Sequence, residues 1–498
     1  MKELDADEFR RLGHIAVELA AEHMFGMRER PVFTPMSGAE RNVLMHASLP
    51  DTGMPPARIL ELVRSRIMAH PMGNGHPRFF GWANSPPSSM GVLSDLLAAA
   101  INPSCAGGDH AAIYVEHCAV RWLMELVGFP TEQSYGVLVS GGSMAALTCL
   151  TAARTRALQR AGWDLRTRGM FGAPQLVLYV SDQGHACMHK AASLLGLGTE
   201  HVRVIRSDDA YRIDVAALEA AIEADRAAGL IPFCVCASAG TVNTGAIDPL
   251  HALSALCERE TLWLHVDGAI GAIAALDSSL EELSALGQAD SLALDPHKWM
   301  GIPVECGAAL VRDAKLLRDT FSLVPPYLRT EPGRGFGGMP WFSEYGFQQT
   351  RGFRALKLWS TLMHLGREGM RRRIEQHRAL ARALALRIAQ EPQLALLTEP
   401  ELAIVCFRYT GIAESTPELL DAFNRALVAQ LQTEGEVFVT GTELKHCYAL
   451  RVSIMHHATR ATDLALLVQL VLNAAARLQE SASQLLSPAA HSGESALR

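Results

Sequence analysis

Lys298 is the first candidate for chemistry because of its neighbours and its place in the chain. It stands in Asp295-Pro296-His297-Lys298-Trp299, at the end of the apolar run SLALD. Burial disfavours the charged ammonium form of a lysine, and the neutral amine is a nucleophile toward carbonyl groups. The alternative is a surface lysine whose stem covers apolar surface while its amine stays in water.

Asp267 stands at the corresponding place in another apolar run, LWLHVD. In open α/β sheets, ligands bind at the carboxyl ends of the strands. A carboxylate there can pair with the protonated pyridine nitrogen of pyridoxal phosphate, and the cationic ring then stabilises a carbanion. For this aspartate taken alone, a helix N-cap is an equally good explanation.

Gly142 and Ser143 lie in the segment VSGGSMAA (139–146), which opens an Ala-rich stretch. Glycines allow close approach of a ligand, and the first turn of a helix presents free N–H groups that suit a phosphate. The Ser143 hydroxyl is a further donor. A plain loop before a helix is the commoner explanation. The pattern matches neither GxGxxG nor GxxxxGK[ST], which disfavours dinucleotide and P-loop sites.

His185 follows the apolar run LVLYVS (176–181). An imidazole can stack on the flat ring of a cofactor, although a capping or core histidine is the simpler alternative. His185 and His189 also have the spacing of a metal-binding pair. No HExxH motif and no obvious third ligand accompany them, so we expect no metal.

The elements that must position these residues are short strands separated by helices. From about 86 to 360, apolar runs alternate with Ala-rich segments such as 215–228. This alternation predicts an α/β fold, with a mostly parallel central sheet and helices on both faces, over residues 86–360. The four candidate positions would then meet at the carboxyl edge of one sheet.

The two ends of the chain lack this regular alternation of strands and helices. Residues 1–85 predict helices, at about 5–30 and 55–69, and the apolar stripe of the first must be buried, for instance by a partner subunit. Residues 361–480 predict a smaller C-terminal α+β domain. The Ser- and Ala-rich tail 481–498 is predicted to be disordered.

Composition narrows the class of protein. The 498 residues are 49% hydrophobic, enough for a large core and more than one domain. A formal net charge of −7 gives no sign of a basic surface that would bind nucleic acid or a membrane. No run of ~18 apolar residues suggests a membrane span, and no signal-peptide pattern is visible. Ten scattered cysteines without a CxxC pair predict free thiols and a cytoplasmic location.

The order of these features resembles the group II pyridoxal-phosphate-dependent amino acid decarboxylases, and most closely the aromatic L-amino acid decarboxylase branch. The likeness spans roughly residues 5–480. It is carried by EFRRLG (8–13), HPRFFG (76–81), SGGSMAALTCLTAAR (140–154), SDQGHACMHKA (181–191), AGLIPF (228–233), AGTVNTGAID (239–248), LWLHVDGAIG (262–271), ADSLALDPHKW (289–299), VPPYLRTE (324–331) and GFRALKLW (352–359).

The resemblance implies a fold type I (aspartate aminotransferase-like) homodimer with active sites at the subunit interface. It implies decarboxylation of an L-amino acid, with an aromatic side chain favoured, to the amine and carbon dioxide. By the same resemblance, Lys298 is the Schiff-base lysine, Asp267 the partner of the pyridine nitrogen and His185 the ring-stacking histidine. Gly142, Ser143 and His297 match positions that hold the phosphate, and Ala269 matches the small residue under the ring.

Tyr327 matches a tyrosine on the mobile loop of this branch, 29 residues after the lysine (327 − 298). In the family this phenol is taken to protonate the carbanion left after carbon dioxide departs, a reasonable task for a general acid. Relatives that make aldehydes oxidatively often have Phe there or lack the stacking histidine. Retention of both residues favours plain decarboxylation.

The chain also departs from the family pattern. Val242 replaces a hydroxyl residue near Asp267, and Ile270 replaces an aromatic. The expected substrate wall comprises Phe80, Trp82, Ala83 and Ser85, with one residue inserted. The segment 107–110 replaces a Trp-containing stretch. An oxidative aldehyde synthase and a carbon–carbon lyase or transferase on the same scaffold remain alternatives. A catalytically inactive binding protein is disfavoured by the intact Lys298, Asp267 and His185.

Overall fold

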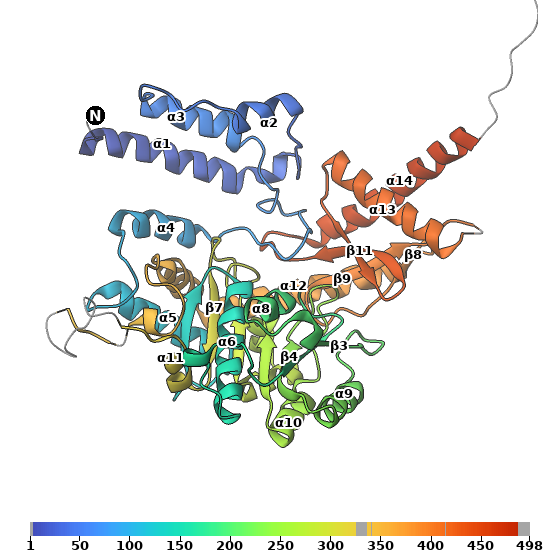
Figure 1. Ribbon diagram of the computed structural model, residues 1–498. Coiled ribbons are helices and arrows are strands. Elements are labelled where there is room, and N and C mark those ends of the chain that lie inside the picture. Colours follow the sequence, from blue (N-terminus) through green and yellow to red (C-terminus); the bar gives the residue numbers. More distant parts are fainter. Residues whose placement is uncertain (1–2, 325–335, 340, 414, 487–498) are drawn as a thin grey trace, which may run out of the picture.

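The computed structural model describes residues 3–324, 336–339, 341–413 and 415–486, with the side chains of 481–486 excepted. The N-terminal helices stand at one side of a large α/β body, and a smaller sheet with two long helices lies beside it (Figure 1). The predicted fold class is confirmed. A seven-stranded, mostly parallel sheet forms the centre of the large body.

The central sheet has the order β1-β7-β6-β5-β4-β2-β3, and only β7 runs antiparallel to its neighbours. Its strands are almost entirely buried on both faces, as expected for a parallel sheet covered by helices. The strands are β1 (Tyr135–Val139), β2 (Leu176–Ser181), β3 (Val202–Ile205), β4 (Ile231–Ser238), β5 (Trp263–Asp267), β6 (Ser291–Leu294) and β7 (Gly307–Val311).

Alternate residues of each strand enter two different hydrophobic cores. In β2, Val177 and Tyr179 join one core, whereas Leu178 and Val180 join the other. Helices cover both faces of the sheet. They are α5 (Ala111–Val127), α6 (Gly142–Arg160), α7 (Leu165–Arg168), α8 (Cys187–Leu194), α9 (Val215–Ala227), α10 (Leu250–Glu260) and α11 (Ala314–Phe321).

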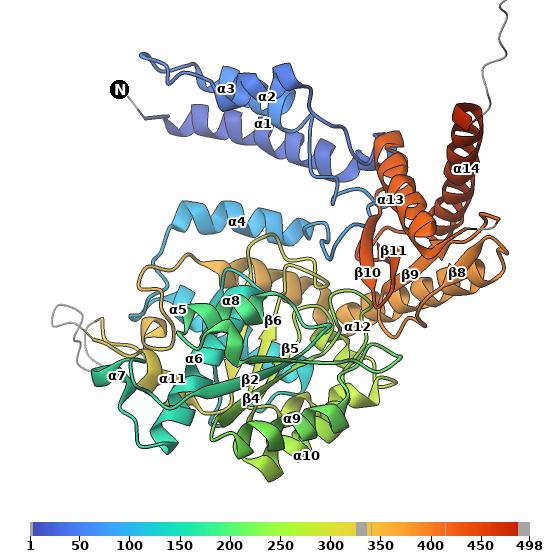
Figure 2. The same cartoon turned by 45° about the vertical axis from the view of Figure 1, so that its right-hand side comes forward.

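The N-terminal segment consists of α1 (Ala6–Phe25), α2 (Gly38–Met45), α3 (Pro56–Leu62) and α4 (Ser89–Ile101). Both views show α1–α3 standing beyond α4, away from the central sheet (Figures 1 and 2). The helix predicted over 5–30 ends earlier, at Phe25. Gly26 closes it because its N–H donates to the Glu22 carbonyl, and a Cβ at 26 would lie 2.7 Å from that oxygen.

The smaller body is an antiparallel sheet of order β10-β11-β9-β8. Helix α12 (Arg354–Ala389) leads into it and changes direction at Gly366, whose φ of 65° is left-handed. The small domain was expected to begin at residue 361, and this position lies inside α12. The other elements are β8 (Leu394–Leu396), β9 (Ile404–Tyr409), α13 (Pro417–Glu434), β10 (Thr440–Leu444), β11 (Cys447–Ser453) and α14 (Ala461–Leu486).

Helix α14 differs from its prediction at the C-terminal end. It continues to Leu486, so the tail expected to be disordered from 481 begins as helix; residues 487–498 lie outside the described residues. Its stretch Ala461–Glu480 is long and apolar enough to cross a membrane, by length and composition only. Buried residues such as Leu467, Val468 and Val471 account for this character, because they belong to the core shared with α12 and α13.

Short irregular helices complete the chain. The helix expected over 55–69 is α3 followed by a π-helical turn at Val63–Ile67. In the part of the chain that the structure describes, 3-10 helices span Met27–Glu29, Thr199–His201, Ala272–Leu276, Glu281–Gln288 and Phe342–Glu344. All ten cysteines are described and all are free thiols, as predicted.

Candidate active site

A cavity of about 680 Å³ opens at the carboxyl ends of the parallel strands. This is the edge at which open α/β sheets bind ligands. Every cofactor-binding residue expected from the sequence lines it. The expected lining residues are Gly142, Ser143, His185, Asp267, Ala269, His297 and Lys298, and Trp82 and Ala83 join them.

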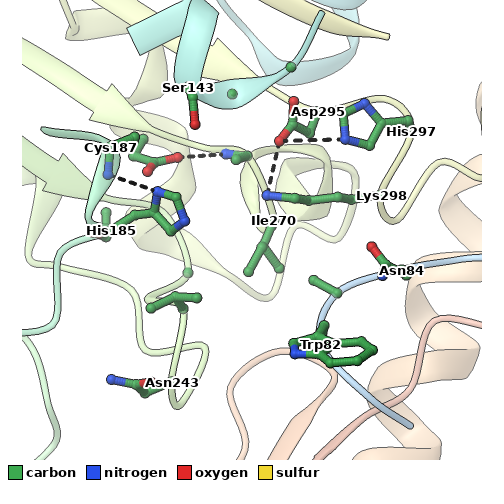
Figure 3. A pocket seen from close by; sticks show the side chains of 18 of the residues that line it. Trp82, Asn84, Ser143, His185, Cys187, Asn243, Ile270, Asp295, His297 and Lys298 are labelled. Carbon is green, nitrogen blue, oxygen red and sulfur yellow. Dashed lines mark hydrogen bonds and ion pairs between the residues drawn. The ribbon is translucent and has the colours of Figure 1, made fainter. Parts of the chain in front are cut away.

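Lys298 follows β6 in a tight turn closed by its own N–H, which donates to the Asp295 carbonyl over 2.9 Å. Its Nζ lies 2.9 Å from Asp295 Oδ2, and its side chain is 22% exposed (Figure 3). The turn is held from two sides. The Ser85 hydroxyl donates to the Lys298 carbonyl, and the next residue, Trp299, donates from Nε1 to His377 Nδ1 over 2.9 Å. The amine is therefore presented to the cavity from a fixed backbone.

Asp267 ends β5 and presents its carboxylate to the same cavity. Its Oδ1 accepts a hydrogen bond from the Ala269 N–H at 3.1 Å, which fixes the carboxylate. Two residues earlier on the strand, His265 is fully buried, and burial lowers the pKa of its ring to about 4. The strand end therefore carries the carboxyl group of Asp267 two residues after an imidazole that is neutral near pH 7.

The N-terminus of α6 forms the opposite part of the cavity. Gly142 and Ser143 are its first residues, and no side chain among the described residues caps it. The first N–H groups of a helix have no intrahelical partner and attract anions. A Cβ at position 142 would lie 2.8 Å from Asp295 Oδ2 and 3.4 Å from the Ala269 methyl, so only glycine fits without displacement. This close approach explains the residue type at 142.

His185 projects from the loop after β2. Its Nδ1 accepts a hydrogen bond from the Cys187 N–H at 3.2 Å, which orients the ring toward the cavity (Figure 3). Ligand-type atoms of His185, Cys187 and Asp267 all lie within 4.8 Å of one another, whereas His189 is not part of this group. Burial raises the pKa of the Cys187 thiol to about 12, so this sulfur is neutral.

His297 lies beside Asp295, close to Gly141 before the start of α6. Its Nδ1 is 2.8 Å from the Cys306 carbonyl oxygen, and its Nε2 is 3.9 Å from Asp295 Oδ2. Burial lowers the pKa of His297, and the nearby Asp295 carboxylate opposes that shift only in part. A neutral ring can donate one hydrogen bond but does not neutralise an anion.

The sequence missed the contribution of the small domain. Arg451 on β11 is 5% exposed and lines the cavity. Its Nε donates to the Val242 and Asn243 carbonyls at 3.0 Å, and a further guanidinium nitrogen donates to the Trp82 carbonyl at 2.9 Å. Within the described part of the chain, no acidic side chain pairs with it. The sequence signal that could have indicated this residue is a single arginine inside the apolar run YALRVSIM (448–455).

Asn243 and Thr442 also line the cavity, and neither was expected there. Thr442 donates from its hydroxyl to Asn243 Oδ1 at 2.7 Å, and Asn243 Nδ2 donates to Gln183 at 3.2 Å. This chain of hydrogen bonds joins the small sheet to the loop that carries His185. The two bodies therefore share one polar network at the site.

The expected substrate wall needs correction at two residues. Phe80 is fully buried in the core, and its backbone extends the small sheet through Phe438 and Ser453. Ser85 is buried and supports the Lys298 backbone, so neither side chain lines the cavity. Trp82 does line it, resting beside the rings of Phe79 and Phe438. Tyr327 lies outside the described residues.

Residues 38–410 match the pyridoxal-dependent decarboxylase conserved domain. The chain belongs to the pyridoxal-dependent decarboxylase family. The chain is 33% identical over 466 residues to the aromatic-L-amino-acid decarboxylase of Bacillus atrophaeus, covering 93% of this chain and 94% of that protein. It is 28% identical to a phenylacetaldehyde synthase of Arabidopsis thaliana, over 91% and 93% of the two chains.

Among solved structures, Oryza sativa TDC with PLP and tryptamine superposes with a TM-score of 0.89 at 26% identity. The alignment covers 96% of this chain and 99% of that one. This protein is therefore a PLP-dependent amino acid decarboxylase, a lyase. The residues of the cavity fit the cofactor. They supply an amine, a carboxylate, a flat ring and a glycine-lined helix N-terminus, in one space of suitable size.

Proposed function

We propose that this decarboxylase converts an aromatic L-amino acid to the corresponding amine and carbon dioxide. The observation that carries the proposal is the meeting of Lys298, Asp267 and His185 in one cavity whose walls include Trp82 and Ile270. The aromatic-L-amino-acid decarboxylase of Bacillus atrophaeus aligns with 93% of this chain. Trp82, Val242 and Ile270 give part of the lining an apolar character, which suits a substrate with an aromatic side chain.

Each cavity residue has a role in this proposal. PLP supplies an electron-withdrawing ring that stabilises the charge left when carbon dioxide departs. Lys298 would hold the cofactor covalently through its amine until a substrate amine replaces it. Asp267 would pair with the ring nitrogen, and His185 and Ala269 would contact the ring. Gly142, Ser143 and His297 would hold the phosphate.

Arg451 binds the substrate carboxylate before the reaction in this proposal. It is a buried cation at the cavity wall, and its hydrogen bonds run to neutral carbonyl groups rather than to a carboxylate. Desolvated charge strengthens its attraction for an anion that enters the cavity. Holding the carboxylate from the side of the small domain would orient the bond that breaks relative to the ring.

Tyr327 decides between two product classes in this proposal. A phenol that protonates the α-carbon after loss of carbon dioxide yields the amine. Without that proton donor, reaction with dioxygen can yield an aldehyde, and relatives named phenylacetaldehyde synthases make the question relevant. Because the chain retains Tyr327, we assign the amine as its product.

The test is a screen of the twenty amino acids and hydroxylated aromatic amino acids for carbon dioxide release. Amine, aldehyde, ammonia and peroxide are quantified under air and under nitrogen. We expect aromatic substrates to react and to yield amine in both atmospheres. Turnover of acidic or small aliphatic amino acids alone would refute the aromatic assignment, and mainly aldehyde under air would refute the assigned reaction.

We also propose that the protein is a cytoplasmic homodimer with active sites at the subunit interface. Support comes from the N-terminal helices, whose apolar side chains are left uncovered in the single chain. On α4, Leu96, Leu97 and Ile101 are 53%, 57% and 63% exposed. An apolar surface of this kind on a soluble enzyme marks an interface with another subunit.

A further inference from the structure

The cavity contains a second buried carboxylate that the proposed function does not use. Asp295 is 6% exposed, and its Oδ2 lies 2.9 Å from Lys298 Nζ. Its Oδ1 is buried and has no hydrogen-bond partner among the described residues. A buried acceptor left without a partner carries a desolvation cost that a bound group could relieve.

Asp295 faces the part of the cavity assigned to the phosphate. A Cβ at position 142 would lie 2.8 Å from its Oδ2, and one at 141 would lie 3.7 Å from its Oδ1. Both positions belong to the N-terminus of α6. The phosphate of the cofactor and the Asp295 carboxylate must therefore be close neighbours, and like charges at such a distance disfavour joint ionisation.

The groups around Asp295 offer little compensation. Those that face it are Lys298, His297, Cys187, Cys306 and Asp267. Burial raises the pKa of both thiols to about 12 and lowers the pKa of His297, so these three groups are neutral near pH 7. Asp267 adds negative charge. The positive charge of Lys357 also contributes to lowering the pKa of His297, but its ammonium group is paired with Asp95.

Among the described residues, Lys298 is the cation paired with Asp295, and cofactor binding would divert it. Its amine condenses with the aldehyde of PLP, one water leaves, and the nitrogen turns to the ring. We propose that Asp295 takes up one proton from solvent when PLP binds, and that the resulting carboxylic acid donates a hydrogen bond to the phosphate. The inference rests on the proposed phosphate position and makes cofactor loading proton-coupled.

The test compares apoenzymes of wild type, Asp295→Asn and Glu305→Gln. Asparagine keeps the size of Asp295 and removes the ionisable group. Glu305 is a matched control, since it lines the same cavity but is 45% exposed at its side chain and paired with Arg354. PLP dissociation constants are measured by tryptophan fluorescence between pH 6 and 8.5. Protons taken up are counted by calorimetry in buffers of different ionisation enthalpy.

We expect wild type and Glu305→Gln to take up about one proton more than Asp295→Asn. Their PLP affinity should fall with rising pH by up to ~10-fold per unit more than that of the variant. Asp295→Asn should bind PLP more tightly at pH 8.5. Equal proton uptake, or weaker binding by the variant at every pH, would overturn the inference.

Pyridoxal, which lacks the phosphate, separates the two neighbours of Asp295. Pyridoxal also condenses with Lys298 but brings no phosphate, so with this probe the difference in proton uptake between wild type and Asp295→Asn should be clearly smaller than with PLP. An equal difference with both probes would mean that Asp295 responds only to the loss of Lys298, and would refute the hydrogen bond to the phosphate. If the variant does not fold, wild type alone decides, because its binding of PLP should take up more protons than its binding of pyridoxal after correction for the phosphate's own titration. Failure of wild type to bind PLP through Lys298 would instead refute the proposed roles themselves.

Discussion

At the scale of single residues, Asp267 and Asp295 share one cavity but have different partners. The Asp267 carboxylate is fixed by the Ala269 N–H and has no cation beside it in the described residues, whereas Asp295 is paired with Lys298. Asp267 is thus free to pair with a cationic ring. One cavity holds a carboxylate suited to the ring and another suited to the lysine.

We predict that Asp267→Asn lowers kcat by about 10²-fold or more, the size expected when one preorganised electrostatic partner is lost. Cofactor affinity should change far less, because Lys298 and the helix N-terminus still hold PLP. Steady-state kinetics and PLP titration of the same preparation measure both. Lys298→Ala is the reference for complete loss of turnover. An unchanged kcat in Asp267→Asn would show that the charge of the ring is not set at this position.

Residue types at strand ends made part of this site predictable. Lys298, Asp267 and His185 each follow a recognisable apolar run, and parallel strands bring such ends together. Arg451 could not be placed because its strand belongs to a different sheet, and only tertiary contacts bring it to the cavity. Phe80 was misplaced for a related reason, since its backbone pairs with the small sheet and its ring turns into the core.

At the scale of elements, the start of α6 depends on close contact with two neighbouring segments. We predict that Gly142→Ala weakens PLP binding by about 10- to 100-fold, because overpacking costs about 1–3 kcal/mol. The added methyl would meet Asp295 Oδ2 and the Ala269 methyl. Fluorescence titration measures the affinity, and circular dichroism confirms the fold. Gly352→Ala is the control, since no atom of the described residues lies within 4 Å of its Cβ position. Equal affinities in the two variants would contradict the predicted crowding.

Element boundaries were predictable where a local signal marks them. At the start of α13 the Thr416 side chain caps the helix and Pro417 stands in its first turn, and both residue types are local signals of a helix start. The kink of α12 at Gly366 carries no such signal, because a lone glycine is compatible with a continuous helix. Helix α12 contacts α4 and α5 as well as β8 and β9 of the small sheet, and such tertiary contacts cannot be read from the sequence of the helix.

At the scale of the whole molecule, the uncovered face of α4 predicts how the chain assembles. Leu97→Glu should convert the proposed dimer to monomer, because a charge would have to be buried in an apolar interface. Analytical ultracentrifugation measures the change. Phe171→Glu is the control, because Phe171 is 97% exposed in a different part of the fold. A dimer that persists in Leu97→Glu would exclude this surface as the interface.

Buried histidines predict how stability depends on pH. Burial lowers the pKa of His76 and His265 to about 4, and of His377 and His456 to about 3, from an unfolded value of 6.5. The unfolded state therefore binds more protons below pH 6.5. The free energy of unfolding should fall as pH drops from 6.5 toward 4, by up to about 1.4 kcal/mol per unit for each histidine.

Urea unfolding at pH 7.5 and 5, at fixed protein concentration, measures this dependence. His377→Gln should reduce the slope by the share of one histidine, because glutamine can still accept from Trp299 but does not gain a proton. His14→Gln is the control, since His14 is exposed on α1. Equal slopes in wild type and His377→Gln would show that this histidine does not drive the loss.

The hydrogen bonds of Arg451 also bear on how the protein is made. Its guanidinium joins the carbonyl of Trp82, near the start of the chain, to those of Val242 and Asn243 in its middle. The ribosome adds Arg451 long after these partners. The part of the cavity wall that Arg451 forms is therefore missing through most of synthesis. The strands of the large sheet and Lys298 are synthesised before that moment, whereas a complete substrate cavity cannot exist until β11 has left the exit tunnel. Nascent chains released early would then retain the groups that bind a cofactor but lack the wall that selects a substrate.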